Sequence, residues 1–209
     1  MKSTSLGSSQ RTWISPCGAK PCRRELPEYN EFTVSTSTHH DTWQERLEWT
    51  LRARWHVLIL EDDQGARASI IDALDRHYRK STDYTASRVR VTEQGTDTAF
   101  VRHIVASVGL PPQRSRYRLF RDFEAYCGRQ YAVDQRVLLL IDDAQHLRLG
   151  TMRVLHSLST IVVGHDLAVQ MVMVGGSEII KQMRNERWRA MESRIGLRMR
   201  WPSRETKAS

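Results

Sequence analysis

The chain has 209 residues, of which 40% are hydrophobic and 27% charged, a composition typical of a globular protein with a sizeable core. Its formal net charge of +8 favours polyanionic partners. No apolar run approaches the ~18–20 residues that span a bilayer, and the N-terminus lacks the apolar core of a secretory signal, so the sequence predicts neither kind of segment. Cys17, Cys22 and Cys127 are too few for a disulfide scaffold and indicate a reducing cytoplasm.

The two ends of the chain differ from its centre in composition. Residues 1–38 are rich in Ser and Thr, contain three of the six prolines and show no periodicity, which predicts a disordered tail. Residues 203–209 form a short polar tail. The sequence therefore predicts a single folded core over residues 42–202.

Hydrophobic periodicity predicts alternating helices and strands within this core. Trp43, Leu47 and Leu51 form a helical stripe, whereas HVLIL is a continuous apolar run typical of a buried strand. The predicted helices cover residues 42–54, 68–80, 96–110, 117–130, 149–162 and 177–195. The predicted strands cover residues 56–60, 87–92, 136–143, 168–176 and 196–202. This order predicts an α/β three-layer sandwich with a central parallel sheet of about five strands.

The turn after the first predicted strand lies where a nucleotide-binding protein has its phosphate loop. Aligned with G-x-x-x-x-G-K-[ST], residues 62–69 place Asp62 and Arg67 at the glycine positions and Ala68 at the lysine position. Only Ser69 agrees with the motif. Glycines let successive N–H groups face the phosphates and lysine neutralises them, so this loop lacks most of the chemistry. The segment is either a degenerate phosphate loop or an unrelated acidic turn.

The predicted strand 136–143 ends in two carboxylates, Asp142 and Asp143. An apolar strand that ends in an acidic pair is the Walker B pattern, in which the first carboxylate holds Mg²⁺ and the second orients the attacking water. The carboxyl edge of a parallel sheet is also where ligands bind. The alternative is that an Asp here only forms a turn or caps the next helix.

Basic residues gather in the last predicted helix. Lys181, Arg184 and Arg187 are spaced three residues apart and predict a face that could contact nucleic acid. A solvated helix rich in arginine is the alternative.

The ordered segments VLIL, IDDAQHL, VMVGGSEI and ESRIGLRMRWP resemble the AAA+ ATPases of the TnsC, TniB and ExeA type. That group includes transposition regulators that assemble on DNA and secretion-associated ATPases. The resemblance covers residues 42–202 and implies a P-loop NTPase core that uses ATP and Mg²⁺. It also implies double-stranded DNA, a transposase-like or secretion partner, and a second copy of the chain as binding partners.

The resemblance assigns a role to several positions of this chain. The nucleotide-binding positions are Gly65, Arg67, Ala68 and Ser69, and the metal positions are Asp142 and Ser69. Asp143 takes the water-orienting position and Arg194 that of an arginine finger. Gly176 and Ser177 take the sensor position at the end of the next strand.

The departures from this family pattern all concern the chemistry. Glu61, Asp62 and Asp63 would repel a triphosphate, and Asp143 replaces the glutamate of the family, one methylene shorter. SRETKAS is too short to supply the helical lid that usually follows, so we expect none. The sequence therefore predicts an AAA+ protein whose own ATP hydrolysis is weak or lost. The alternatives are a non-hydrolysing module that binds DNA or a protein partner, and an interaction domain with no nucleic-acid role.

Overall fold

The computed structural model describes residues 32–33, 40–93 and 95–201, and all structural statements below concern these residues. They all belong to the compact unit that runs from Glu31 to Ser209. The segment predicted as a disordered tail falls largely outside them. The exception is Phe32–Thr33, which forms a short strand.

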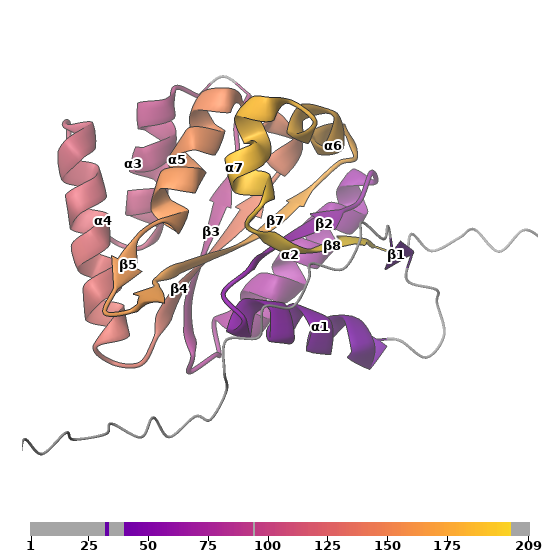
Figure 1. The fold of residues 1–209 in the computed structure, drawn as a ribbon, viewed down its shortest axis with the longest axis horizontal. Helices are drawn as coiled ribbons and strands as arrows, with labels where there is room; N and C mark the ends of the chain where they lie inside the picture. The colour runs from indigo at the N-terminus through magenta and orange to yellow at the C-terminus, as the bar shows by residue number, and fades with distance from the viewer. Residues whose placement is uncertain (1–31, 34–39, 94, 202–209) are drawn as a thin grey trace, which may run out of the picture. The chain divides into compact units, whose positions relative to one another are not determined.

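Six parallel strands form one sheet in the order β1–β8–β2–β7–β4–β3 (Figure 1). Their bounds are β1 Phe32–Thr33, β2 His56–Leu60, β3 Tyr84–Arg90, β4 Arg136–Asp142, β7 Val169–Gly175 and β8 Ile195–Arg200. The five long strands confirm the predicted parallel sheet. β2 and β7 are buried along their whole length, because runs of Val, Leu, Ile and Met suit strands covered on both faces.

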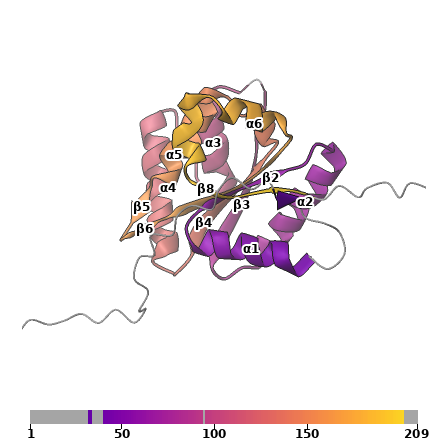
Figure 2. The ribbon, with the colours of Figure 1, turned by 45° about the vertical axis from the view of Figure 1, so that its right-hand side comes forward.

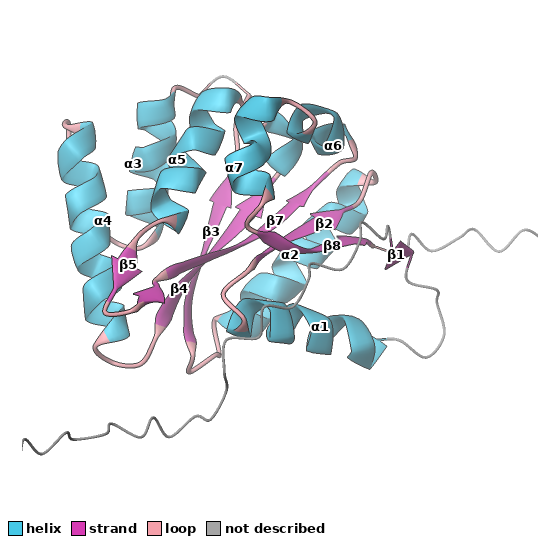
Figure 3. Ribbon diagram, in the orientation of Figure 1, coloured by secondary structure: helices cyan, strands magenta, loops and turns pink. Residues whose placement is uncertain are grey.

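Helices cover both faces of the sheet, as Figure 2 shows from a second angle and Figure 3 by secondary structure. The helices are α1 His40–Arg52, α2 Gln64–Tyr78, α3 Asp97–Ser107, α4 Arg116–Tyr131, α5 Leu149–Ser159, α6 Glu178–Met183 and α7 Arg189–Glu192, with 3₁₀ turns at Ala144–His146 and Glu186–Trp188. One hydrophobic cluster joins the sheet to α1 and α2. A larger cluster joins it to α3, α4, α5 and the α6–α7 segment. This is the predicted three-layer arrangement.

The prediction of one continuous helix over residues 177–195 is wrong. The structure divides it into α6, the 3₁₀ turn and α7. The break occurs at Asn185, whose backbone is extended and whose side chain accepts a hydrogen bond from the N–H of Arg187. An Asn side chain competes with helical hydrogen bonding in this way, a local effect that overrides the apolar period.

Other boundaries differ from the prediction by up to four residues. The helix predicted to begin at residue 68 begins at Gln64, because Asp63 caps it and accepts from the N–H of Ala66. The helix predicted to end at residue 162 ends at Ser159. A short hairpin of β5 Val162–Val163 and β6 Asp166–Leu167 follows it.

Candidate functional site

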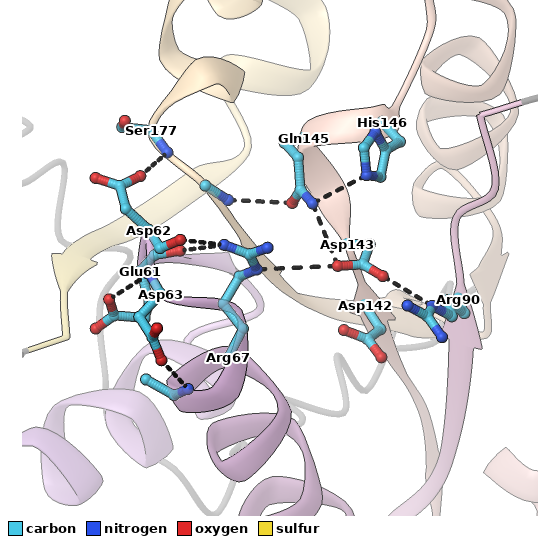
Figure 4. Close-up of polar contacts among 12 residues, drawn as sticks. Glu61, Asp62, Asp63, Arg67, Arg90, Asp142, Asp143, Gln145, His146 and Ser177 are labelled. Carbon is cyan, nitrogen blue, oxygen red and sulfur yellow. Dashed lines mark hydrogen bonds and ion pairs between the residues drawn. The ribbon is translucent and has the colours of Figure 1, made fainter.

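The carboxyl edge of the sheet brings together the acidic loop after β2 and the acidic pair at the end of β4 (Figure 4). Between them lies a cavity of about 530 Å³. Its walls include Asp62, Arg67, Arg90, Asp143, Gln145 and Glu178. The structure therefore brings together the candidate phosphate loop and the acidic pair.

The acidic loop is short, because β2 ends at Leu60 and α2 begins at Gln64. Six of the eight positions aligned with the phosphate-loop motif, residues 64–69, therefore lie inside α2. Beyond the first turn of a helix each N–H is bonded to a carbonyl four residues earlier and cannot face a ligand. Ser69 lies in this region, where its hydroxyl donates to the carbonyl of Gly65 at 3.0 Å.

Each carboxylate of the acidic loop accepts a hydrogen bond from a backbone N–H. Glu61 accepts from the N–H of Asp63 at 2.9 Å, and Asp63 accepts from the N–H of Ala66 at 2.6 Å. Asp62 accepts from the N–H of Ser177 at 2.7 Å. That bond lowers the pKa of Asp62, with smaller contributions from the Ser177 hydroxyl and Arg200. Three donors at this end of the sheet, the N–H groups of Asp63, Ala66 and Ser177, are thus occupied by the chain's own carboxylates.

Arg67 extends from α2 between the acidic loop and Asp143 (Figure 4). Its guanidinium donates to the backbone carbonyls of Glu61 at 3.0 Å and Asp62 at 2.8 Å. Its Nε lies 3.9 Å from Oδ1 of Asp143. Arg67 therefore supplies a positive charge near the position where the motif requires a lysine, and this charge is engaged within the loop.

Both carboxylates of the acidic pair are paired with arginines of β3. Arg88 donates to Asp142 from Nη2 at 2.6 Å and from Nε at 3.2 Å. Arg90 donates to Asp143 at 2.8 Å. Burial alone would raise the pKa of Asp143, but the bonds from Arg90 and Gln145 outweigh burial and lower it. Asp142 and Asp143 are both buried.

Gln145, in the turn after β4, connects the acidic pair to the end of β7. Its side chain donates to Asp143 at 3.2 Å and accepts from the N–H of Gly176 at 3.1 Å. A Cβ added at Gly175 would lie 2.9 Å from the backbone nitrogen of Gln145, so this approach needs a glycine. The predicted sensor residues Gly176 and Ser177 therefore lie beside the two acidic loops.

The remaining predicted residues lie apart from this cavity. Arg194 precedes β8 at the opposite, amino edge of the sheet, where its guanidinium donates to the carbonyl of Ser159 at 3.2 Å. Lys181, Arg184 and Arg187 are exposed on the α6–α7 segment.

Sequence reasoning missed Arg88 and Arg90. The alternation S-R-V-R-V places both arginines on the same face of β3. Because β3 neighbours the strand that ends in Asp142 and Asp143, the available signal was this alternation combined with the strand order.

Known proteins resemble the chain at the level of a domain family and of a fold. A family model described as an AAA domain matches residues 67–183. A search of curated proteins found no match.

Solved structures with the same fold include ORC and Cdc6 proteins. The ADP form of the Aeropyrum pernix ORC2 protein has a TM-score of 0.58 at 14% identity over 83% of this chain and 50% of that one. Cdc6p from Pyrobaculum aerophilum has a TM-score of 0.55 at 17% identity over 82% and 47%. A Drosophila ORC chain, in a structure bound to DNA, has a TM-score of 0.53 at 9% identity over 79% and 91%. The chain spans about half the length of the two archaeal proteins.

ATP and Mg²⁺, which the family implies, do not fit the side-chain arrangement of this site. A triphosphate would compete with three carboxylates for the N–H donors, and a metal ion at Asp142 would compete with Arg88. Within the described residues, no group of three or more His, Cys, Asp or Glu side chains could hold a metal ion. None of the described helices is long and apolar enough to cross a membrane.

The family model covers more than half of the chain, and the strand order and flanking helices agree with it. The chain belongs to the AAA domain family and has the fold of the AAA+ P-loop ATPases.

Proposed function

We propose that this chain is an AAA+ module of the type found in transposition regulators, with weak or lost ATP binding and hydrolysis. The observation that carries the proposal is the engagement of the loop donors by Glu61, Asp62 and Asp63. A phosphate that binds the N–H groups of Asp63, Ala66 and Ser177 must displace these carboxylates. It must also overcome the repulsion of three negative charges.

The acidic pair supports the same proposal. In a working site, Asp142 and Ser69 would hold Mg²⁺ and Asp143 would orient water. In this chain the Asp142 carboxylate is paired with Arg88. The Ser69 hydroxyl donates within α2, and Asp143 is paired with Arg90. Each side chain that the reaction needs is therefore engaged with another residue of the chain.

We propose binding of double-stranded DNA as a second activity. Lys181, Arg184 and Arg187 are exposed, and the net charge of the chain is +8. Flexible cations on a surface bind phosphates without reading sequence. The DNA named with the Drosophila ORC structures supports this partner class at the level of fold. A transposase-like or secretion partner and self-association belong to the same proposal.

Calorimetric titration of the full chain with ATP and Mg²⁺ tests the loss of nucleotide binding. We expect a dissociation constant weaker than about 1 mM, which corresponds to ~4 kcal/mol. The Asp142→Asn variant is the matched control, since residual binding through a metal at Asp142 would disappear in it. A micromolar constant in the unchanged chain would refute the proposal.

A further inference from the structure

We infer that side chains of this protein replace both ligands of the ancestral site, with carboxylates in place of phosphate and guanidinium groups in place of the cations. We call this set the carboxylate–arginine network. It comprises Glu61, Asp62, Asp63, Arg67, Arg88, Arg90, Asp142 and Asp143. The inference rests on the proposed function, because a chain that bound MgATP tightly would have no need of such replacements. It goes further in stating that the edge of the sheet keeps one arrangement whether or not nucleotide is present.

The anionic half of the network occupies donors that come from two separate parts of the chain. Glu61 and Asp63 accept N–H groups within their own loop and the first turn of α2. Asp62 instead reaches the N–H of Ser177, 115 residues away in sequence. A phosphate group in a loop of this kind makes the same type of contact, an anionic oxygen that accepts from backbone N–H groups.

The cationic half of the network consists of three guanidinium groups. Arg67 bonds two carbonyls of the acidic loop. Arg88 lies on Asp142 at 2.6 Å and also contacts Asp72 of α2 at 2.6 Å. Arg90 lies on Asp143 at 2.8 Å. Charge-assisted bonds of this kind are about twice as strong as neutral ones.

The network connects the ends of four neighbouring strands. Asp62 connects the end of β2 to the end of β7. Arg88 and Arg90 connect β3 to the end of β4. Arg67 completes the set, since its Nε lies 3.9 Å from Asp143 while its Nη1 donates to two carbonyls of the acidic loop.

A ligand changes a conformational equilibrium only by its differential affinity for the states. These connections use groups of the chain alone, so a nucleotide could reach the donors engaged in them only by displacing a carboxylate or carbonyl of the chain, and it gains little affinity for one state over another. The contacts that this AAA+ module makes with its partners are therefore independent of nucleotide.

Hydrogen exchange of individual amides in the full chain tests the inference. In the unchanged chain we expect the amide of Ser177 to be protected from exchange. Its exchange rate should be the same with and without about 5 mM MgATP, a concentration above a dissociation constant of about 1 mM. Asp62→Ala should speed exchange at Ser177 by roughly tenfold or more. Asp62→Asn, which keeps an acceptor oxygen, should have a smaller effect.

A second variant and a control make the result specific to the network. Asp63→Ala should speed exchange at the amide of Ala66 and leave that of Ser177 unchanged. Glu186→Gln removes an exposed carboxylate 3.7 Å from Arg189, outside the network, and should change neither amide. Equal exchange at Ser177 in the unchanged chain and in Asp62→Ala would overturn the inference. Slower exchange at Ser177 on addition of MgATP to the unchanged chain would also overturn it.

The two proposals can fail separately. Micromolar ATP affinity together with an Asp62-dependent amide at Ser177 in the free chain would refute the proposed function and leave the network in place. Absence of ATP binding together with an unaffected Ser177 amide in Asp62→Ala would refute the network and leave the proposed function in place.

Discussion

Arg88 of β3 and Asp142 of β4 form an ion pair with two hydrogen bonds, of which the shorter is 2.6 Å. The Asp142 side chain is 7% exposed and that of Arg88 is 34% exposed. The pair is therefore buried on its acidic side, and the carboxylate depends on this arginine for compensation of its charge.

Replacement of Arg88 should destabilise the fold. Arg88→Met keeps most of the aliphatic stem but leaves the carboxylate of Asp142 buried without its cation. We expect the free energy of unfolding, measured by urea denaturation near neutral pH, to fall by about 2–3 kcal/mol. The control is Asp72→Asn, which alters the second partner of Arg88. The Asp72 side chain is 55% exposed, so this change should cost less than about 1 kcal/mol. Equal losses in the two variants would contradict the assignment.

His56, at the start of β2, should make the protein sensitive to acid. The side chain is 1% exposed, and neither ring nitrogen has a hydrogen-bond partner among the described residues. Burial, with the charges of Arg194 and His156, lowers the pKa of His56 from 6.5 to about 4. Between these values the unfolded chain binds a proton that the folded chain does not, so stability is lost as the pH falls. The loss should be on the order of 3 kcal/mol at 1.36 kcal/mol per pKa unit.

His56→Leu is the variant that tests this account of acid sensitivity. It removes two buried unpartnered nitrogens, so the free energy of unfolding should rise by about 1–3 kcal/mol at neutral pH. The difference from the unchanged protein should widen as the pH falls from 6.5 towards 4. A difference that stays constant over this range, measured by urea denaturation at each pH, would show that His56 does not titrate as described.

Arg194 should act on the two neighbouring histidines of its own chain. Burial lowers the pKa of His156, and the positive charge of Arg194 lowers it further. Arg194→Ala should therefore raise the pKa values of both His156 and His56, as measured by NMR titration. It should also cost roughly 1 kcal/mol of stability through the lost bond to the carbonyl of Ser159. Arg189→Ala removes the same positive charge from an exposed position and should leave the pKa values of His156 and His56 unaltered. Equal pKa changes in the two variants would show that Arg194 is not the specific cause of the lowered values.

DNA binding should depend steeply on salt. Replacement of Lys181, Arg184 and Arg187 by Ala should flatten the slope of log affinity against log salt by about two to three units if each side chain contacts one phosphate. The matched control replaces three other exposed cations, Arg52, Arg76 and Lys80, and should change the slope by less. An unchanged slope in the first variant, or no DNA binding even at low salt, would show that these three cations form a solvated surface that does not bind DNA.

The sequence alone determined the fold class and the edge of the sheet at which the candidate site lies. Runs such as HVLIL and RVLLLID are typical of strands covered on both faces, and their separation by helices favours parallel pairing. Because ligands of such sheets lie at the carboxyl ends of the strands, the positions of Asp62 and Asp142 followed from local pattern. Local pattern also predicted that the phosphate loop lacks its lysine, a statement about residue types alone.

Only the tertiary structure decided which charges meet. Arg88 and Asp142 are 54 residues apart, and Asp62 and Ser177 are 115 apart, so no local period relates them. Their pairing follows from the strand order β2–β7–β4–β3, in which strands that are distant in sequence lie side by side in the sheet. The start of α2 at Gln64 likewise depended on one side-chain hydrogen bond, in which the carboxylate of Asp63 accepts from the N–H of Ala66. Ala68 and Ser69 therefore lie beyond the first turn of α2, where each N–H group is bonded to a carbonyl of the preceding turn and cannot face a phosphate.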